Sequence, residues 1–211
     1  MEQKAPRAVI FDLGRVILDF DHNIAAQKIY RFTAKTPNEI YQIFFDSDLT
    51  VSFEEGKISP FDFYLRIKEL LALRLGYEDF VDIWNSIFFL TPDNLEVYSL
   101  AIRLSRHYPT LLLSNINLLH LEYIKKEFSI FDAFNYIVAS CKVGAVKPKP
   151  VIYKQALELL SLSAEDVFYT DDRPELVQAA KELGINSSVY KGPEKLREDL
   201  VGFGFPREVV Q

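Results

Sequence analysis

The sequence contains little of what several protein classes require. It has one cysteine, Cys141, in 211 residues, which excludes a disulfide framework or a cysteine-rich zinc module and fits a reducing compartment. Basic residues are not in excess: 24 Lys and Arg stand against 30 Asp and Glu, a net charge of −6, whereas nucleic-acid binding usually goes with a strong basic field. No apolar run approaches the roughly 20 residues that cross a bilayer, and the first residues show no secretory signal pattern. We therefore expect a soluble cytoplasmic protein with neither nucleic acid nor membrane as a partner.

What is present is a composition typical of a folded domain. Hydrophobic residues make up 49% of the chain and charged residues 26%, values that exclude a disordered chain. The length suits one large domain, or one domain that carries an insertion.

The first half of the chain has the pattern of one strand followed by a long helical region. Residues 7–12 form a compact apolar run that ends in an acid, as in a strand buried on both faces. From about 23 to 90, apolar and aromatic residues recur at helical spacing, and we expect no strand between 22 and 108. Ser59 and Thr91, each followed by proline, mark helix starts.

The second half alternates between short apolar strands and helices. The expected strands lie at residues 111–113, 136–139, 167–169 and 188–190, and the expected helices after residue 115 and at 148–160, 174–183 and 193–201. Such alternation implies right-handed crossovers and a parallel sheet. The predicted fold class is α/β, a Rossmann-like parallel sheet core with helices on both faces and a helical insertion after the first strand. Residues 1–20 and 92–211 would form the core domain and residues 21–91 the inserted domain.

Polar residues follow the predicted strands at their carboxyl ends, where ligands bind in such sheets. They are Asp12, the pair Ser114-Asn115, Lys147 in the loop before a helix, and the pair Asp171-Asp172. Clustered carboxylates repel one another and favour a hard divalent cation such as Mg²⁺. A lysine and a hydroxyl beside that cation make a site for a tetrahedral oxyanion. These positions alone point to metal-assisted phosphoryl chemistry.

The segments around these residues are FDLGRVI at 11–17, LLLSN at 111–115, VGAVKPKPVIY at 143–153 and FYTDDRPELVQAA at 168–180. In this order they resemble the four motifs of the haloacid dehalogenase-like hydrolase superfamily. The match is nearest to the small phosphatases with a helical cap inserted after the first strand. FEEGKIS at 53–59 and SNINLLH at 114–120 add to the resemblance, which covers essentially the whole chain.

The resemblance implies a phosphoric monoester hydrolase that works through an aspartyl-phosphate on Asp12. Mg²⁺ would be bound by Asp12, by the backbone carbonyl of Gly14 and by the pair Asp171-Asp172. We favour Asp172 as a direct ligand, with Asp171 either direct or acting through water.

The remaining implied roles concern the phosphoryl group. Ser114 and the backbone N–H of Asn115 would hold its oxygens, and Lys147 would neutralise charge on the nucleophile and the phosphate. The substrate would be a small phosphorylated metabolite, such as a sugar phosphate or a nucleotide. The helical cap would act as a lid that selects it and excludes bulk water. Either a monomer or a homodimer is compatible with the sequence.

Two positions depart from the pattern of these phosphatases. Gly14 stands where most members have a second Asp, which protonates the leaving group, so we expect the best activity on aryl or acyl phosphates. Asp19 and Asp21 are the first candidates to replace that acid. Arg15 stands where small residues or Asn are commoner, and it would either bind a substrate anion or lie on the surface.

Two other functions remain open at this point. One is metal-free hydrolysis of a carbon–halogen bond, as in the dehalogenases, which also lack the second Asp. The other is a catalytically weakened member that binds a phosphorylated ligand without turnover. We expect Cys141 to be inert and the histidines, His22, His107 and His120, to be structural or exposed.

Overall fold

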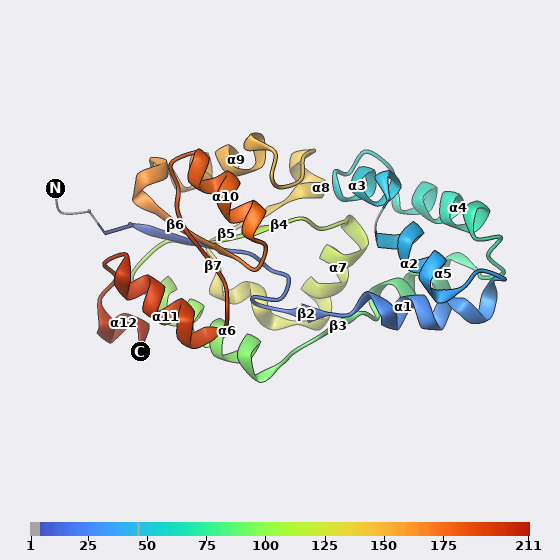
Figure 1. The fold of residues 1–211 in the computed structure, drawn as a ribbon, viewed down its shortest axis with the longest axis horizontal. Coiled ribbons are helices and arrows are strands. Elements are labelled where there is room, and N and C mark those ends of the chain that lie inside the picture. Colours follow the sequence, from blue (N-terminus) through green and yellow to red (C-terminus); the bar gives the residue numbers. More distant parts are fainter. Residues whose placement is uncertain (1–4, 46) are drawn as a thin grey trace.

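The computed structural model describes residues 5–45 and 47–211. At its centre is a parallel sheet with the strand order β5-β4-β1-β6-β7 (Figure 1). The strands are β1 (Ala8–Phe11), β4 (Thr110–Ser114), β5 (Tyr136–Ala139), β6 (Val167–Asp171) and β7 (Asn186–Val189). Every strand predicted for the sheet is found, and the α/β fold class is confirmed.

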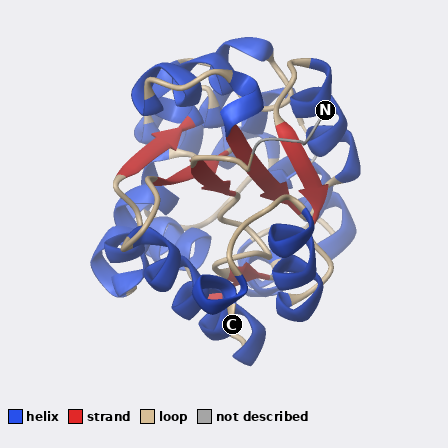
Figure 2. Cartoon of the chain, turned by 90° about the vertical axis from the view of Figure 1, so that its left-hand side faces the viewer, coloured by secondary structure: helices blue, strands red, loops and turns tan. Residues whose placement is uncertain are grey.

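Helices cover both faces of the sheet, because successive side chains of a buried strand point to opposite sides. In β1, Val9 and Phe11 pack into one core cluster, and Ala8 and Ile10 pack into another. The first cluster includes residues of α6 (Pro92–Ser105), α7 (Leu118–Glu127), α11 (Pro193–Gly202) and α12 (Arg207–Val210), and the second those of α9 (Pro150–Leu160) and α10 (Pro174–Glu182). Figure 2 shows the strands with helices above and below them. The short elements α8 (Ser140–Val143), η2 (Ser129–Ala133) and η3 (Ala164–Asp166) complete this part.

The segment between the first sheet strand and α6 is the predicted helical insertion, and it lies at the right-hand end of Figure 1. Its helices are α1 (His22–Ile29), η1 (Tyr30–Phe32), α2 (Pro37–Phe45), α3 (Asp48–Glu54), α4 (Pro60–Leu70) and α5 (Tyr77–Asn85). They surround a core of their own, rich in buried aromatic rings that include Phe44, Phe53, Phe63, Phe80 and Trp84. These aromatic rings therefore form the packed interior of the insertion.

One expectation about this segment is wrong: it contains a strand. β2 (Asp19–Phe20) enters the insertion and pairs in an antiparallel manner with β3 (Phe88–Phe89), which leaves it. A strand of two residues is too short to show a period of two, and Phe88 directly continues the apolar spacing of α5. The two segments that connect the sheet to the insertion are thus paired as a short two-stranded antiparallel ribbon.

Helix starts follow the local sequence signals. Ser59 Oγ accepts a hydrogen bond from the N–H of Asp62 at 3.1 Å, and Thr91 forms a capping box with Asn94. Within residues 5–45 and 47–211, none of the helices combines the length and the apolar character that a bilayer crossing needs.

Candidate active site

The loops at the carboxyl edge of the sheet bring together the residues that the sequence singled out. Asp12 follows β1, and Ser114 ends β4. Lys147 lies in the loop before α9, and Asp171 ends β6 with Asp172 beside it. Ligand oxygens of the three aspartates all lie within 4.8 Å of one another. Asp171 is fully buried, Asp12 is nearly so and Asp172 is half-buried.

Lys147 is buried among these carboxylates. Its Nζ donates to Asp12 Oδ1 and to Asp171 Oδ2, each at 2.6 Å, and to the carbonyl oxygen of Leu113 at 3.0 Å. Asn115 holds the peptide of this lysine: its Nδ2 donates to Lys147 O at 3.0 Å, and its Oδ1 accepts from Lys147 N at 2.7 Å. This use of the Asn115 side chain was not predicted. The two hydrogen bonds with Asn115 hold the peptide of Lys147 and so keep its ammonium beside Asp12.

The charges of this cluster are out of balance. Burial raises the pKa of Asp12 from 3.8 to about 7; Lys147 opposes the rise, while Asp171 and Asp172 add to it. Burial and then the charge of Asp171 raise the pKa of Asp172. Burial alone would lower the pKa of Lys147, but Asp12 and Asp171 together raise it. Three carboxylates share one ammonium, and a divalent cation would neutralise the remainder.

The free carboxylate oxygens indicate which side chains fit such a cation. Both oxygens of Asp171 are engaged: Oδ1 accepts from Arg173 N at 2.9 Å, and Oδ2 accepts from Lys147 and from the Tyr169 hydroxyl. Asp12 uses Oδ1 toward Lys147, and its Oδ2 accepts no hydrogen bond from the residues that the structure describes. The carboxylate of Asp172 has no hydrogen bond or ion pair within the part of the chain that the structure describes. An all-oxygen donor set of this kind fits a hard ion such as Mg²⁺.

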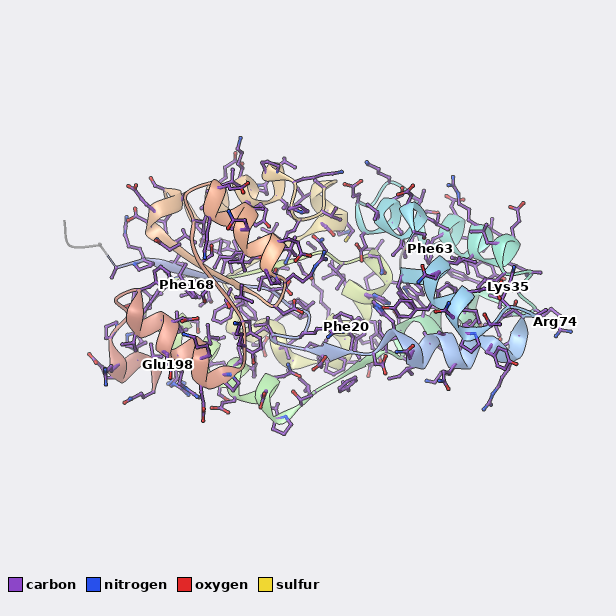
Figure 3. All side chains as sticks on the ribbon, viewed as in Figure 1. Phe20, Lys35, Phe63, Arg74, Phe168 and Glu198 are labelled. Atoms are coloured by element: carbon purple, nitrogen blue, oxygen red, sulfur yellow. The ribbon has the colours of Figure 1, made fainter. Side chains whose placement is uncertain are left out.

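A side chain at position 14, two residues after Asp12, would meet the ring of Phe20. A Cβ on this glycine would lie 2.8 Å from Cε1 of Phe20. A tight turn brings the ring there: Arg15 has φ 59, and its N–H donates to Leu18 O at 2.8 Å. The exposed Arg15 guanidinium lies 5.3 Å from the centre of the Phe20 ring. Figure 3 labels Phe20 between the sheet and the insertion.

A cavity of about 590 Å³ lies over this edge of the sheet, within the size range of small-molecule sites. The predicted site residues that line it are Asp12, Gly14, Arg15, Ser114, Asn115, Lys147 and Asp172. Asp171 is fully buried and accepts a hydrogen bond from the cavity residue Lys147. All the predicted residues are therefore gathered at one place.

Stacked rings also line the cavity. The ring of His22 stacks on Phe45 with centroids 3.7 Å apart, Phe45 stacks on Trp84 at 5.2 Å, and Trp84 stacks on His120 at 5.0 Å. His120 accepts from Asn117 Nδ2 at 3.0 Å and donates Nε2–H to Trp84 O at 3.1 Å. His120 is thus structural, as expected, yet it also lines the cavity. The segment SNINLLH was the signal for Asn117 and His120, but no sequence signal placed His22 here.

Glu54 is a cavity residue to which the sequence assigned no role, although it lies in the segment FEEGKIS. It is half-buried and comes from the end of α3. Asp19 and Asp21, the first candidates for the missing acid, both accept hydrogen bonds from neighbouring backbone groups. Asp19 accepts from the N–H of Phe20, and Asp21 caps α1 by accepting from the N–H of Asn23. Neither is among the described residues that line the cavity.

Comparison with known sequences gives a consistent picture. A family model described as haloacid dehalogenase-like hydrolase matches residues 6–184. The D-ribitol-5-phosphate phosphatase of Bacteroides thetaiotaomicron is 23% identical over 198 residues, 91% of this chain and 95% of that one. A sesquiterpene phosphatase of Aspergillus oryzae is 25% identical over 179 residues, 85% of this chain and 87% of its own.

Solved structures share the architecture. A HAD family enzyme from Bacteroides thetaiotaomicron, in complex with magnesium and inorganic phosphate, superimposes with a TM-score of 0.78 at 25% identity, over 88% of this chain and 94% of that chain. The L-2-haloacid dehalogenase of Xanthobacter autotrophicus gives a TM-score of 0.63 at 20% identity, over 97% of this chain and 86% of its own. The second likeness shows a common fold alone.

Proposed function

The chain belongs to the haloacid dehalogenase-like hydrolase family, and from this premise we propose that it is a magnesium-dependent phosphatase acting on a small phosphorylated metabolite. The observation that carries the proposal is the gathering of the Asp12, Asp171 and Asp172 oxygens within 4.8 Å, with Lys147 in contact with two of these carboxylates. Further support comes from the two phosphatases among the relatives and from the magnesium and phosphate in the structural neighbour.

The proposed ligands of Mg²⁺ are a carboxylate oxygen of Asp12, a carboxylate oxygen of Asp172 and the backbone carbonyl of Gly14, with Asp171 acting directly or through water. When bound, the ion would cancel the repulsion between an anionic nucleophile and a phosphate. Asp171, whose two oxygens already accept protein hydrogen bonds, would mainly orient Lys147.

Asp12 is the proposed nucleophile. Because Lys147 holds its Oδ1 at 2.6 Å, Oδ2 is left to attack phosphorus and form an aspartyl-phosphate. Among the described residues, Ser114 Oγ makes only a long contact of 3.4 Å to the carbonyl oxygen of Asn115. It is therefore available, with the Asn115 backbone N–H, to hold the phosphoryl oxygens. Arg15, exposed and lining the cavity, would bind an anionic or hydroxyl group of the substrate.

Metal-free hydrolysis of a carbon–halogen bond is the competing reaction. Gly14 favours it, because no alcohol has to be protonated when a halide leaves. The pair Asp171-Asp172 argues against it, since these carboxylates would add only repulsion to a site without a cation. The third function left open is binding of a phosphorylated ligand without turnover. Such a protein would still bind the cation but would not hydrolyse the ligand.

Hydrolysis assays on 4-nitrophenyl phosphate and 2-chloropropionate, each with Mg²⁺ or with EDTA, separate the three functions. We expect phosphate release that requires Mg²⁺ and is abolished in Asp12→Asn. Halide release in EDTA would instead identify a dehalogenase. Binding of phosphate without hydrolysis of any phosphate ester would identify a binding protein, and either result would overturn the proposal.

A further inference from the structure

Hydrolysis of an alkyl phosphate needs a proton for the departing oxygen, and position 14 does not supply one. Gly14 has no side chain, and the Phe20 ring lies 2.8 Å from where its Cβ would be. Assistance by a general acid or base is typically worth about 10²–10⁴-fold, so the proton has to come from elsewhere in the cavity. This inference rests on the proposed phosphatase function.

Most of the titratable groups that line the cavity are unsuited to this task. Burial lowers the pKa of His22 to about 4 and the pKa of His120 to about 3. His120 also uses both ring nitrogens in hydrogen bonds within the protein. Of the three carboxyl groups that line the cavity within residues 5–45 and 47–211, Asp12 is the proposed nucleophile and Asp172 a proposed metal ligand. The third is Glu54.

The backbone of Glu54 is attached to the sheet although the residue belongs to the insertion. Ser140 Oγ donates to the carbonyl oxygen of Glu54 at 2.7 Å and accepts from the N–H of Ile116 at 2.8 Å. Gly56 has φ +66, and a Cβ there would collide with the carbonyl oxygen of Cys141. Only glycine allows the two backbones to approach so closely in this conformation. The end of α3 is therefore held against the loops that carry the site.

Two adjacent glutamates have opposite environments at this place. The carboxylate of Glu55 is paired with Lys149, two residues beyond Lys147, and the hydrogen bond from Lys149 lowers its pKa to about 2. Glu54 has no hydrogen-bond or ion-pair partner for its carboxyl group within residues 5–45 and 47–211. Burial raises the pKa of Glu54 to about 7, against the opposing charges of Arg173 and Lys147. Glu55 anchors the segment, and Glu54 is left to line the cavity with a carboxyl group that can both give and take a proton near neutral pH.

We propose that Glu54 is the acid–base residue of the reaction. As Asp12 Oδ2 bonds to phosphorus and the bond from phosphorus to the substrate oxygen breaks, the carboxyl group of Glu54 gives its proton to that oxygen and an alcohol leaves. The carboxylate of Glu54 then takes a proton from the water that attacks the aspartyl-phosphate. Inorganic phosphate leaves, Asp12 is free again, and Glu54 is protonated for the next cycle.

The test compares Glu54→Gln with the wild-type protein on two substrates. With 4-nitrophenyl phosphate, whose leaving group needs no proton, the variant should release one equivalent of nitrophenol in a burst and then turn over slowly. Mass spectrometry should then find a phosphoryl group on the protein, because no base activates the water. With a simple alkyl phosphate, kcat should fall by about 10²–10⁴-fold and no burst should occur. The exposed Glu69, changed to Gln, is the matched control and should keep both activities.

A second variant, Glu54→Asp, keeps the carboxyl group and should recover much of the alkyl phosphate activity that the amide loses. Wild-type turnover of the alkyl phosphate by Glu54→Gln, or an equal loss in both variants, would overturn the role of Glu54 while leaving the phosphatase in place. Absence of Mg²⁺-dependent hydrolysis in the wild-type protein would overturn the proposed function itself.

Discussion

The Nζ of Lys147 lies 2.6 Å from Oδ1 of Asp12. The lysine is held at this distance from both ends, because Asn115 binds its peptide group and Leu113 accepts from its ammonium. One oxygen of the proposed nucleophile is thereby committed to an ion pair before any substrate arrives. Oδ2 is left to attack phosphorus, and Oδ1 keeps a second lone pair for the metal, so a single side chain orients the reacting carboxyl group.

Removal of this ammonium should destabilise the fold as well as stop the reaction. Lys147→Met leaves the buried carboxylates of Asp12 and Asp171 without their partner, and loss of one member of a buried ion pair costs about 3–5 kcal/mol. Urea unfolding of the metal-free protein at pH 8 should show a loss of this size. Lys142→Met, at an exposed lysine, should change the free energy of unfolding little. Equal unfolding midpoints for the two variants would contradict the buried pair.

Mg²⁺ should stabilise the protein through the aspartate cluster. A ligand at about 100 times its Kd adds about 2.7 kcal/mol, which for a chain of this size raises Tm by about 5–10 °C. Asp172→Asn removes a proposed ligand whose oxygens are free, so the rise should disappear while the metal-free Tm stays near that of the wild type. If Mg²⁺ raised the Tm of the variant to the same extent, Asp172 would not be a ligand.

An aspartate introduced at position 14 should not provide a proton donor, because its side chain would meet the ring of Phe20. In Gly14→Asp the new Cβ meets the Phe20 ring at 2.8 Å, and such overpacking costs about 1–3 kcal/mol. The variant should be less stable, with no gain in alkyl phosphate hydrolysis. Adding Phe20→Ala provides the space and should recover part of the stability lost. A faster and equally stable Gly14→Asp protein would mean that the ring moves aside freely.

The pH dependence should identify the proton donor. Glu54 donates only in its protonated form, and its pKa is raised to about 7, so kcat/KM for an alkyl phosphate should fall as pH rises above about 7. The charges that act on it are those of Arg173 and Lys147, which lower its pKa, and of Glu55, which raises it. For 4-nitrophenyl phosphate this decline should be absent, because kcat/KM reports the first displacement. The same decline on both substrates would assign it to another group.

The residues at the sheet edge were predictable because parallel strands share one carboxyl edge. Asp12, Ser114 and Asp171 each end or follow a buried apolar run, so their convergence needs only the strand assignments. The strand β3 was missed because Phe88 and Phe89 leave no room for a recognisable alternation. This strand forms because it pairs with β2, which lies at the other end of the insertion. A local sequence pattern carries no information about such a distant partner.

The position of Glu54 over the cavity could not be predicted from the sequence for a related reason. Its segment was noticed, but its position over the cavity depends on the contacts of Ser140 with its carbonyl and of Gly56 with Cys141. These residues lie far apart in the chain, and nothing in their spacing relates them. His22 was missed in the same way, because its ring contacts with Phe20 and Phe45 depend on the folded structure.

The location of Glu54 on the insertion has a consequence for how this enzyme could change. When the proton donor stands two residues after the nucleophile, an exchange of the inserted helices alters substrate choice alone. In this chain the same exchange would also remove the proposed proton donor, because Glu54 belongs to the inserted helices. Substrate specificity and protonation of the leaving group would therefore change together. Chimeras between this protein and its relatives should accordingly keep residues 53–56 with the sheet to which they are fastened.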